Sequence, residues 1–261
     1  MIDVYFSAEK WLSMNCTLVQ VSDRQGDGLF LVGPEKSRHL RNHLKIGVGS
    51  RIFAGVLEGP LGWATVESDD GVRLKITAPE GPVPPRPPVD LVLAMPRPKV
   101  MGRLWGALAS IGIGHLYIIG AEEVEACYFS ARTLEPQYRL PKLIEGLEQV
   151  RDTRLPEVTV EKSFRRFATG ILPNLSPHGI RLLGHPGAAH SVREVLASPA
   201  CREGRVMLAV GPEGGWREKE LDVLSFHGFV PASLHSRALR TDTAVISLLA
   251  LIYDALPGDR H

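Results

Sequence analysis

The sequence predicts an α/β protein in two parts, a small β-rich module followed by a larger domain built on a mainly parallel sheet. Between residues 16 and 78, short apolar stretches alternate with Gly and Asp turns, a pattern typical of a small barrel or sandwich. Beyond residue 88, apolar stretches alternate with helical ones, which is typical of a parallel sheet covered on both faces. The 261 residues, 44% of them hydrophobic, suffice for two such cores.

The first part is expected to hold five short strands and one helix. The strands are predicted at residues 17–21, 29–32, 51–56, 63–67 and 72–77. The helix is predicted at 35–45, because this stretch follows Gly33-Pro34 and ends before Gly47. Residues 1–13 have no strong period, so we expect a short extension or an upstream start codon, with the patterned chain beginning at Met14.

A proline-rich segment at 79–88 separates the two parts. Its six prolines in ten residues force an extended backbone and support neither a helix nor the interior of a sheet. We therefore predict an extension at 1–13, a first domain at 14–78, a linker at 79–88 and a second domain at 89–261. In the second domain, strands are predicted at 89–94, 116–119, 180–183 and 206–210, and helices at 100–111, 138–150, from 191, at 218–224 and from 244.

Composition excludes several classes of protein. Lys and Arg number 30 against 29 for Asp and Glu, so the net charge of +1 gives no overall attraction to nucleic acid or membrane. Cys16, Cys127 and Cys201 form no CxxC pair, which argues against a disulfide framework or a zinc site and suits a reducing compartment. The longest nearly uninterrupted apolar run, 244–253, is about half of the roughly 20 residues that a membrane span needs. We therefore expect a cytoplasmic enzyme without a metal.

The clearest basic cluster begins on the predicted first helix. It contains no acid and comprises Lys36, Arg38, Arg41, Lys45 and Arg51. Two explanations of this cluster are equally good. One is a solvated helix face, and the other is contact with RNA phosphates, because a small β module beside a basic helix suits recognition of RNA by shape and phosphate. His39 and His43 have the i, i+4 spacing of zinc ligands, but the glutamate of HExxH and a third ligand are missing.

The common cofactor motifs are missing from the chain. No Gly-Lys pair exists, which excludes a P-loop, and no GxSxG elbow occurs. Gly112-Ile113-Gly114 precedes a strand, whereas a dinucleotide motif precedes a helix. The turn at 211–215 differs, because it follows a buried strand and its glycines let backbone groups approach a ligand closely. A plain turn is the alternative, but a second polar turn at 234–240 follows at the next strand-to-helix junction, so we predict one pocket.

The two polar turns carry a resemblance to a known family. GPEGG at 211–215 followed by Glu220, and the turn from Leu234 to Ala244, match the late motifs of a group of RNA methyltransferases. Weaker matches lie upstream, at 39–52 and at 148–158. On these residues the chain resembles the SPOUT class, and within it the family that methylates N3 of a uridine in 16S ribosomal RNA.

The resemblance implies a PUA-like RNA-binding β-barrel joined to a methyltransferase domain whose C-terminal chain passes through a loop as a trefoil knot. Similar proteins bind S-adenosylmethionine within the knot and act as homodimers, with RNA lying across the subunit interface. Arg237 would join the residues that contact RNA. By position, the cofactor site would draw on Leu183, Gly184, His185, Val210, Gly211, Pro212, Glu213, Gly214, Gly215, Leu234, His235, Ser236, Ala238 and Leu239.

The chemistry of methyl transfer to a uracil nitrogen suggests catalytic roles for charged residues of the two turns, beside the expected methyl position. Arg240 would stabilise the negative charge that develops on the uracil carbonyls, and Asp242 or Glu213 would accept the N3 proton, directly or through water. Helix capping and an ion pair at the start of the last helix are the alternative role for Arg240 and Asp242. The apolar face of that helix, from Ala244 to Ile252, is expected to be intrachain core, with a dimer seam as the alternative.

The chain departs from the family pattern in its middle. Residues 107–112 lack the usual lysine and glutamate, and 120–125 are acidic where the family tends to carry a Thr-x-Arg-Ser segment. His235, Lys45 and Asp242 stand where Gly, Arg and Glu are usual. Three functions therefore stay open: N3 methylation of a uridine in 16S RNA, methylation of another ribosomal or transfer RNA position, and a non-catalytic RNA-binding role in ribosome assembly.

Overall fold

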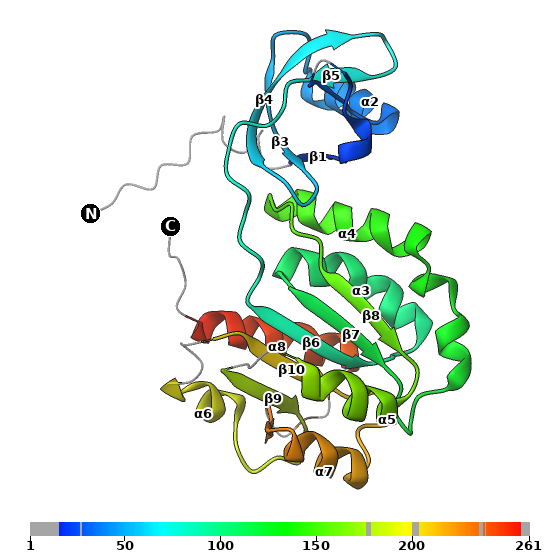
Figure 1. Ribbon diagram of the computed structural model, residues 1–261, viewed down its shortest axis with the longest axis vertical. Helices are drawn as coiled ribbons and strands as arrows, with labels where there is room; N and C mark the ends of the chain where they lie inside the picture. Colours follow the sequence, from blue (N-terminus) through cyan, green and yellow to red (C-terminus); the bar gives the residue numbers. More distant parts are fainter. Residues whose placement is uncertain are drawn as a thin grey trace. The chain divides into compact units, whose positions relative to one another are not determined.

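The computed structural model describes residues 16–26, 28–175, 179–199, 204–234, 237 and 239–256 (Figure 1). Within this range the chain forms two compact units, each with its own sheet. The first unit comprises the described residues up to Arg86 together with Ile144–Leu155, and the second comprises Pro87–Leu143 and the described residues from Pro156 onward. The extension expected at 1–13 lies outside the described residues.

The first unit holds a five-stranded sheet in the order β1-β3-β4-β5-β2. Its strands are β1 (Thr17–Val19), β2 (Phe30–Leu31), β3 (Arg51–Val56), β4 (Leu61–Asp69) and β5 (Leu74–Ile76). β1 pairs with β3 in parallel, and the other neighbours are antiparallel. A 3₁₀ turn, η1 (Val21–Asp23), follows β1, and helix α2 (Pro34–Leu44) follows β2. The five strands and the helix expected from the sequence are thus confirmed.

Alternation along β3 decides which face of this sheet forms the core. Ile52, Ala54 and Val56 are buried in one cluster with Leu40 of α2, since successive side chains of a strand point to opposite faces. On the other face, a Cβ at Gly55 would lie 2.5 Å from the Thr153 methyl group. The segment that carries Thr153 therefore packs closely against this end of the sheet.

The second unit is built on a six-stranded sheet in the order β11-β9-β10-β6-β7-β8, in which every neighbouring pair is parallel (Figure 1). Its strands are β6 (Val89–Ala94), β7 (His115–Ile119), β8 (Glu157–Glu161), β9 (Ile180–Gly184), β10 (Val206–Val210) and β11 (Phe229–Ala232). The predicted parallel sheet is confirmed. The sequence does not predict β8, because this edge strand carries charged ends and no fully buried residue.

Helices cover both faces of the parallel sheet. On one face, α3 (Pro98–Ile111) and α8 (Thr241–Ala255) pack against each other, and α8 packs on β10. On the other, α5 (Phe164–Arg166) with the turns that follow it and α7 (Glu218–Phe226) bury Phe167, Leu172 and Leu224 against the strands. The remaining elements are η2 (Ala126–Ser130), η3 (Arg132–Leu134), α4 (Pro136–Val150), η4 (Phe167–Ile171), η5 (Leu172–Asn174) and α6 (Val192–Leu196).

Helix α8 contributes its apolar side to the core of the second unit. Val245, Leu248, Leu249 and Ile252 are all buried. The expectation of intrachain core is therefore confirmed for these four side chains. Within the described part of the chain, no helix combines the length and the apolar character that crossing a membrane requires.

Candidate active site

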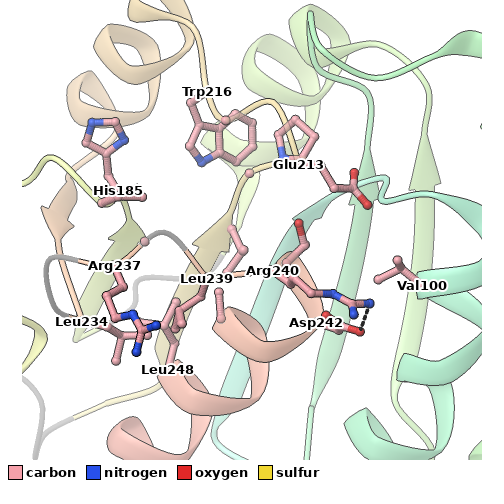
Figure 2. Close-up of a pocket in the computed structure, with 18 of the residues that line it drawn as sticks. Val100, His185, Glu213, Trp216, Leu234, Arg237, Leu239, Arg240, Asp242 and Leu248 are labelled. Carbon is pink, nitrogen blue, oxygen red and sulfur yellow. Dashed lines mark hydrogen bonds and ion pairs between the residues drawn. The ribbon is translucent and has the colours of Figure 1, made fainter.

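Three strand ends of the second unit meet at one pocket of about 530 Å³ (Figure 2). The pocket is lined by Gly184 at the end of β9, Val210 at the end of β10 and Ala232 at the end of β11, each with residues that follow it. These strands are parallel neighbours, so their carboxyl ends lie at the same edge of the sheet. The prediction that the two polar turns share one pocket is confirmed.

Two glycines keep the pocket wall free of side chains. A Cβ at Gly211 would lie 3.1 Å from the indole of Trp216, and a Cβ at Gly184 would lie 2.8 Å from Leu248 Cδ1. A third, Gly215, has a φ of 78°, a left-handed conformation that glycine adopts without strain. Close packing therefore explains the glycines at 184 and 211, and backbone conformation explains the glycine at 215.

Trp216 forms a buried part of the pocket wall. Its side chain is 7% exposed, and within the described residues its buried Nε1 has no hydrogen-bond partner. Leaving a buried donor unsatisfied costs about 1–3 kcal/mol. An acceptor that reached this nitrogen, from a ligand or from water, would therefore stabilise the site.

The pocket has two chemically different ends. Arg240, Asp242 and Val100 lie together at one end, whereas His185 and Arg237 lie at the other (Figure 2). Arg240 immediately precedes α8, and its side chain is 71% exposed. Its guanidinium can therefore reach a substrate at the pocket mouth.

Asp242 is held by two arginines. Its Oδ2 accepts a hydrogen bond from Arg103 of α3 at 2.6 Å and one from Arg240 at 3.3 Å. The hydrogen bond from Arg103 is the main cause that lowers the pKa of Asp242 below its ordinary value, and the charge of Arg240 lowers it further. Asp242 is therefore a weak proton acceptor that orients two cations. The ion pair expected as its alternative role is present, but Arg240 at the N-cap position makes no side-chain cap.

Glu213 is the second carboxylate at the pocket. Its side chain is exposed, and Oε1 accepts the backbone N–H of Arg97 at 3.2 Å. Among the residues that the structure describes, Glu213 forms no ion pair. It is thus held less tightly than Asp242.

The acidic segment at 120–125 is held beside the glycine turn at 211–215 by two residues, Glu220 of α7 and Arg217 at the N-cap of that helix. Arg217 pairs with Glu123 and lies 4.0 Å from a carboxylate oxygen of Glu122. Glu220, only 5% exposed, accepts the backbone N–H groups of Glu122 at 2.9 Å and of Arg217 at 3.0 Å. Arg217 therefore offsets part of the negative charge that distinguishes this segment from the family pattern.

Most of the predicted site residues line the pocket. Leu183 and Gly214 do not line it within the described chain, because Leu183 is fully buried in the core and Gly214 lies against Glu123. His235, Ser236 and Ala238 lie outside the described residues. The predicted residues that line the pocket are Gly184, His185, Val210, Gly211, Pro212, Glu213, Gly215, Leu234, Arg237, Leu239, Arg240 and Asp242.

Several residues that line the pocket were not predicted from the sequence. They are Arg97, Val100, Pro186, Trp216, Ala232, Thr241, Ala244 and Leu248. Arg97 could have been predicted, because it closely follows the carboxyl end of β6, and ligands bind at the carboxyl ends of neighbouring parallel strands such as β6 and β10. Val100 and Leu248 could not have been predicted in this way, because it takes the packing of α3 and α8 to bring them to the pocket.

The basic cluster of the first unit divides into paired and exposed residues. Lys36 forms an ion pair with Glu148 at 2.5 Å, and Arg41 forms one with Asp69 at 2.9 Å. Contact of these two side chains with RNA would require competition with their carboxylates. The exposed members are Arg38, Lys45 and Arg51.

The histidines and cysteines among the described residues form neither a metal-binding group nor a disulfide. His39 and His43 lie with their ring centroids 4.9 Å apart, but no group of three or more His, Cys, Asp or Glu side chains there could hold a metal ion. Cys16 is a buried free thiol, and Cys127 is an exposed one.

Known proteins resemble this chain along most of its length. The model of the RNA methyltransferase domain family matches residues 84–253. The ribosomal RNA small subunit methyltransferase E of Treponema pallidum is 30% identical over 219 residues, which cover 82% of this chain and 80% of that protein. The protein of the same name from Mycobacterium bovis is 25% identical over 225 residues, 85% of each chain. The structure of a ribosomal RNA small subunit methyltransferase E from Neisseria gonorrhoeae, bound to S-adenosyl methionine, has a TM-score of 0.69 at 20% identity and covers 92% of this chain and 98% of that one.

The parallel sheet, the pocket at its strand ends and the matched domain define an RNA methyltransferase with an α/β fold. The resemblance first seen in the two late turns is confirmed at the level of the family. The chain belongs to the ribosomal RNA small subunit methyltransferase E family.

Proposed function

We propose that this protein transfers a methyl group from S-adenosylmethionine to N3 of a uridine in 16S ribosomal RNA. The observation that carries the proposal is the glycine-walled pocket at the ends of β9, β10 and β11, with Arg240 and Glu213 on its lining. Relatives that cover most of the chain are named small subunit ribosomal RNA methyltransferases, and a solved protein of the same fold is bound to S-adenosyl methionine.

The lining residues fit this cofactor in size and chemistry. Small-ligand pockets measure about 300–1,000 Å³ and are mostly apolar, with a few placed polar groups. Here the pocket of about 530 Å³ combines Leu234, Leu239 and Leu248 with the free backbone of Gly184 and Gly211. We assign the apolar wall to the adenosine part. Backbone groups of the two glycine-bearing turns would supply the polar contacts.

The catalytic roles follow from the end of the pocket that carries Arg240. When bound, S-adenosylmethionine would supply an electrophilic methyl group on its sulfonium. Arg240 stabilises the negative charge that builds on the uracil carbonyl oxygens as N3 loses its proton. Glu213 accepts that proton, directly or through water. Asp242 is the poorer acceptor because two arginines hold it as an anion, and it orients Arg240 instead.

Three measurements test the proposed function in sequence. Calorimetric titration with S-adenosylmethionine comes first, and absent binding would leave only the non-catalytic role in ribosome assembly. Mass mapping of 16S RNA from a strain that lacks the protein comes second. If N3-methyluridine persists in that RNA, this chain is not its source, and methylation of another RNA position becomes the favoured hypothesis. Single-turnover methylation by Arg240→Ala at saturating cofactor is expected to fall about 100-fold or more, and a wild-type rate would remove Arg240 from the mechanism.

We also propose the finer architecture that the family resemblance implies. The first unit is a PUA-like RNA-binding barrel, and in the second the last part of the chain passes through a loop as a trefoil knot. The order β11-β9-β10-β6 supports the knot, because the chain after β11 returns to the pocket formed by the loops after β9 and β10. A crystal structure in which residues 233–241 pass outside such a loop would show that the chain has no knot. Homodimerisation completes the proposal, and sedimentation that shows only monomer at micromolar concentration would count against it.

A further inference from the structure

An aromatic pair flanked by two arginines occupies the outward face of the β3–β4 hairpin. Phe53 and Trp63 lie opposite each other in register, with ring centroids 5.5 Å apart in an edge-to-face arrangement. The guanidinium carbon of Arg51 lies 5.2 Å from the Trp63 centroid, and that of Arg151 lies 5.0 Å from the Phe53 centroid. These four side chains form the aromatic face.

The aromatic face is not part of the core of the first unit. The alternate residues Ile52 and Ala54 of β3 and Ala64 of β4 fill that core from the other side of the sheet. Among the described residues, Thr153 closes one end of the outward side by packing against Gly55. At the open end Trp63 remains 41% exposed and Arg51 is exposed.

Single exposed aromatic residues are common and need no function. Here, however, the exposed ring is held by a second ring, and each ring has a guanidinium within cation–π distance. Planar guanidinium groups both stack on rings and bind phosphate in a bidentate manner. The combination of a π surface with fixed positive charge suits a ligand that has a flat base and an anionic backbone.

We propose that the aromatic face binds an unpaired nucleotide of the RNA substrate, with its base stacked on Trp63 and its neighbouring phosphates contacted by Arg51 and Arg151. Proteins read single-stranded RNA in this way, by stacking bases on aromatic side chains and arginine planes. The proposal deepens the proposed function, because it rests on ribosomal RNA as the substrate. It also supplies the first unit with an RNA contact that does not depend on Lys36 and Arg41, which are paired with carboxylates.

The test uses full-length protein and the anisotropy of a fluorescein-labelled, single-stranded RNA dodecamer of mixed sequence. Trp63→Ala is expected to weaken binding about 10- to 100-fold, the worth of one stacked base. Trp63→Phe, which keeps a ring, is expected to stay within about threefold of wild type. The matched control is Val72→Ala, which removes another exposed apolar side chain of the same unit, 59% exposed, and is expected to change nothing.

The outcomes separate this inference from the proposed function. Wild-type RNA affinity in Trp63→Ala overturns the inference, whereas calorimetric binding of S-adenosylmethionine and methylation of small subunits by the wild type test the function independently. A changed sedimentation coefficient in Trp63→Ala also overturns it, because the face would then be a contact between copies of the chain. Equal loss of RNA affinity in Trp63→Ala and Trp63→Phe would indicate disrupted packing and likewise rule out stacking.

Discussion

Arg103 and Asp242 are joined by an ion pair of 2.6 Å, although they lie 139 positions apart in the chain. The pair links α3 to the first turn of α8 at the end of the pocket where Arg240 lies. Arg240 in turn contacts the same carboxylate oxygen at 3.3 Å. We therefore expect Arg103 to act on the site through Asp242, as a positioning residue for Arg240.

Replacing Arg103 should impair methyl transfer without impairing cofactor binding. Arg103→Ala leaves Asp242 free to pair with Arg240 alone, so we expect single-turnover methylation to fall about tenfold and the dissociation constant for S-adenosylmethionine to stay within about threefold. Because the Arg103 side chain is 45% exposed, the free energy of unfolding should fall by only about 0.2–1 kcal/mol. Arg103→Lys keeps the charge and should recover part of the rate. Equal losses of cofactor affinity and rate would contradict a positioning role.

The lowered pKa of Asp242 predicts how activity responds to pH. Because the pKa in the folded state lies below the ordinary 3.8, the carboxylate stays ionised from pH 5 to pH 9. Asp242→Asn should therefore reduce single-turnover methylation by the same factor throughout that window. Any stability that the ion pairs contribute is present above the unfolded-state pKa and is lost as pH falls through the lowered folded-state value. A defect of Asp242→Asn that disappears between pH 5 and pH 6 would show that the group titrates there.

Gly211 offers a steric test of the pocket. Gly211→Val places its side chain against the indole of Trp216, which already lies 3.1 Å from the position of a Cβ. Overpacking of this kind costs about 1–3 kcal/mol of folding free energy and shifts the neighbouring side chains. Because Gly211 and Trp216 both line the pocket, the affinity for S-adenosylmethionine measured by calorimetry should fall about 10-fold or more. Gly170→Ala is the matched control in the same unit, because a Cβ there meets nothing within 4 Å. Unchanged affinity in Gly211→Val would place the cofactor elsewhere.

The two described cysteines should react at very different rates. Burial is the main cause that raises the pKa of Cys16 to about 12, and the charge of Glu148 raises it further. At pH 8 the Cys16 thiol is therefore almost entirely protonated, and thiolate is the reactive form. Mass spectrometry of iodoacetamide-treated native protein should show labelling of exposed Cys127 at least about 100-fold faster than of Cys16. Unfolding in guanidinium should abolish the difference, and rapid labelling of native Cys16 would contradict its burial.

Most secondary structure could be read from the sequence, because the signals are local. Apolar runs mark β6, which Asp90 alone interrupts, and β10, and Pro98 and Gly112 bracket α3 through a fixed proline φ and a glycine at φ 93°. The edge strand β8 escaped prediction, since its exposed and charged residues lack the apolar run of a buried parallel strand.

The sequence by itself determined the glycine turn at 211–215, the arginine before the last helix and the family to which both belong. Only the tertiary structure decided what surrounds them. Arg103 meets Asp242 because α3 packs on α8, and Arg51 and Arg151 meet one aromatic pair because residues 144–155 belong to the first unit. Residue patterns encode backbone conformation over a few neighbours, whereas contacts between distant segments depend on packing that no local pattern records.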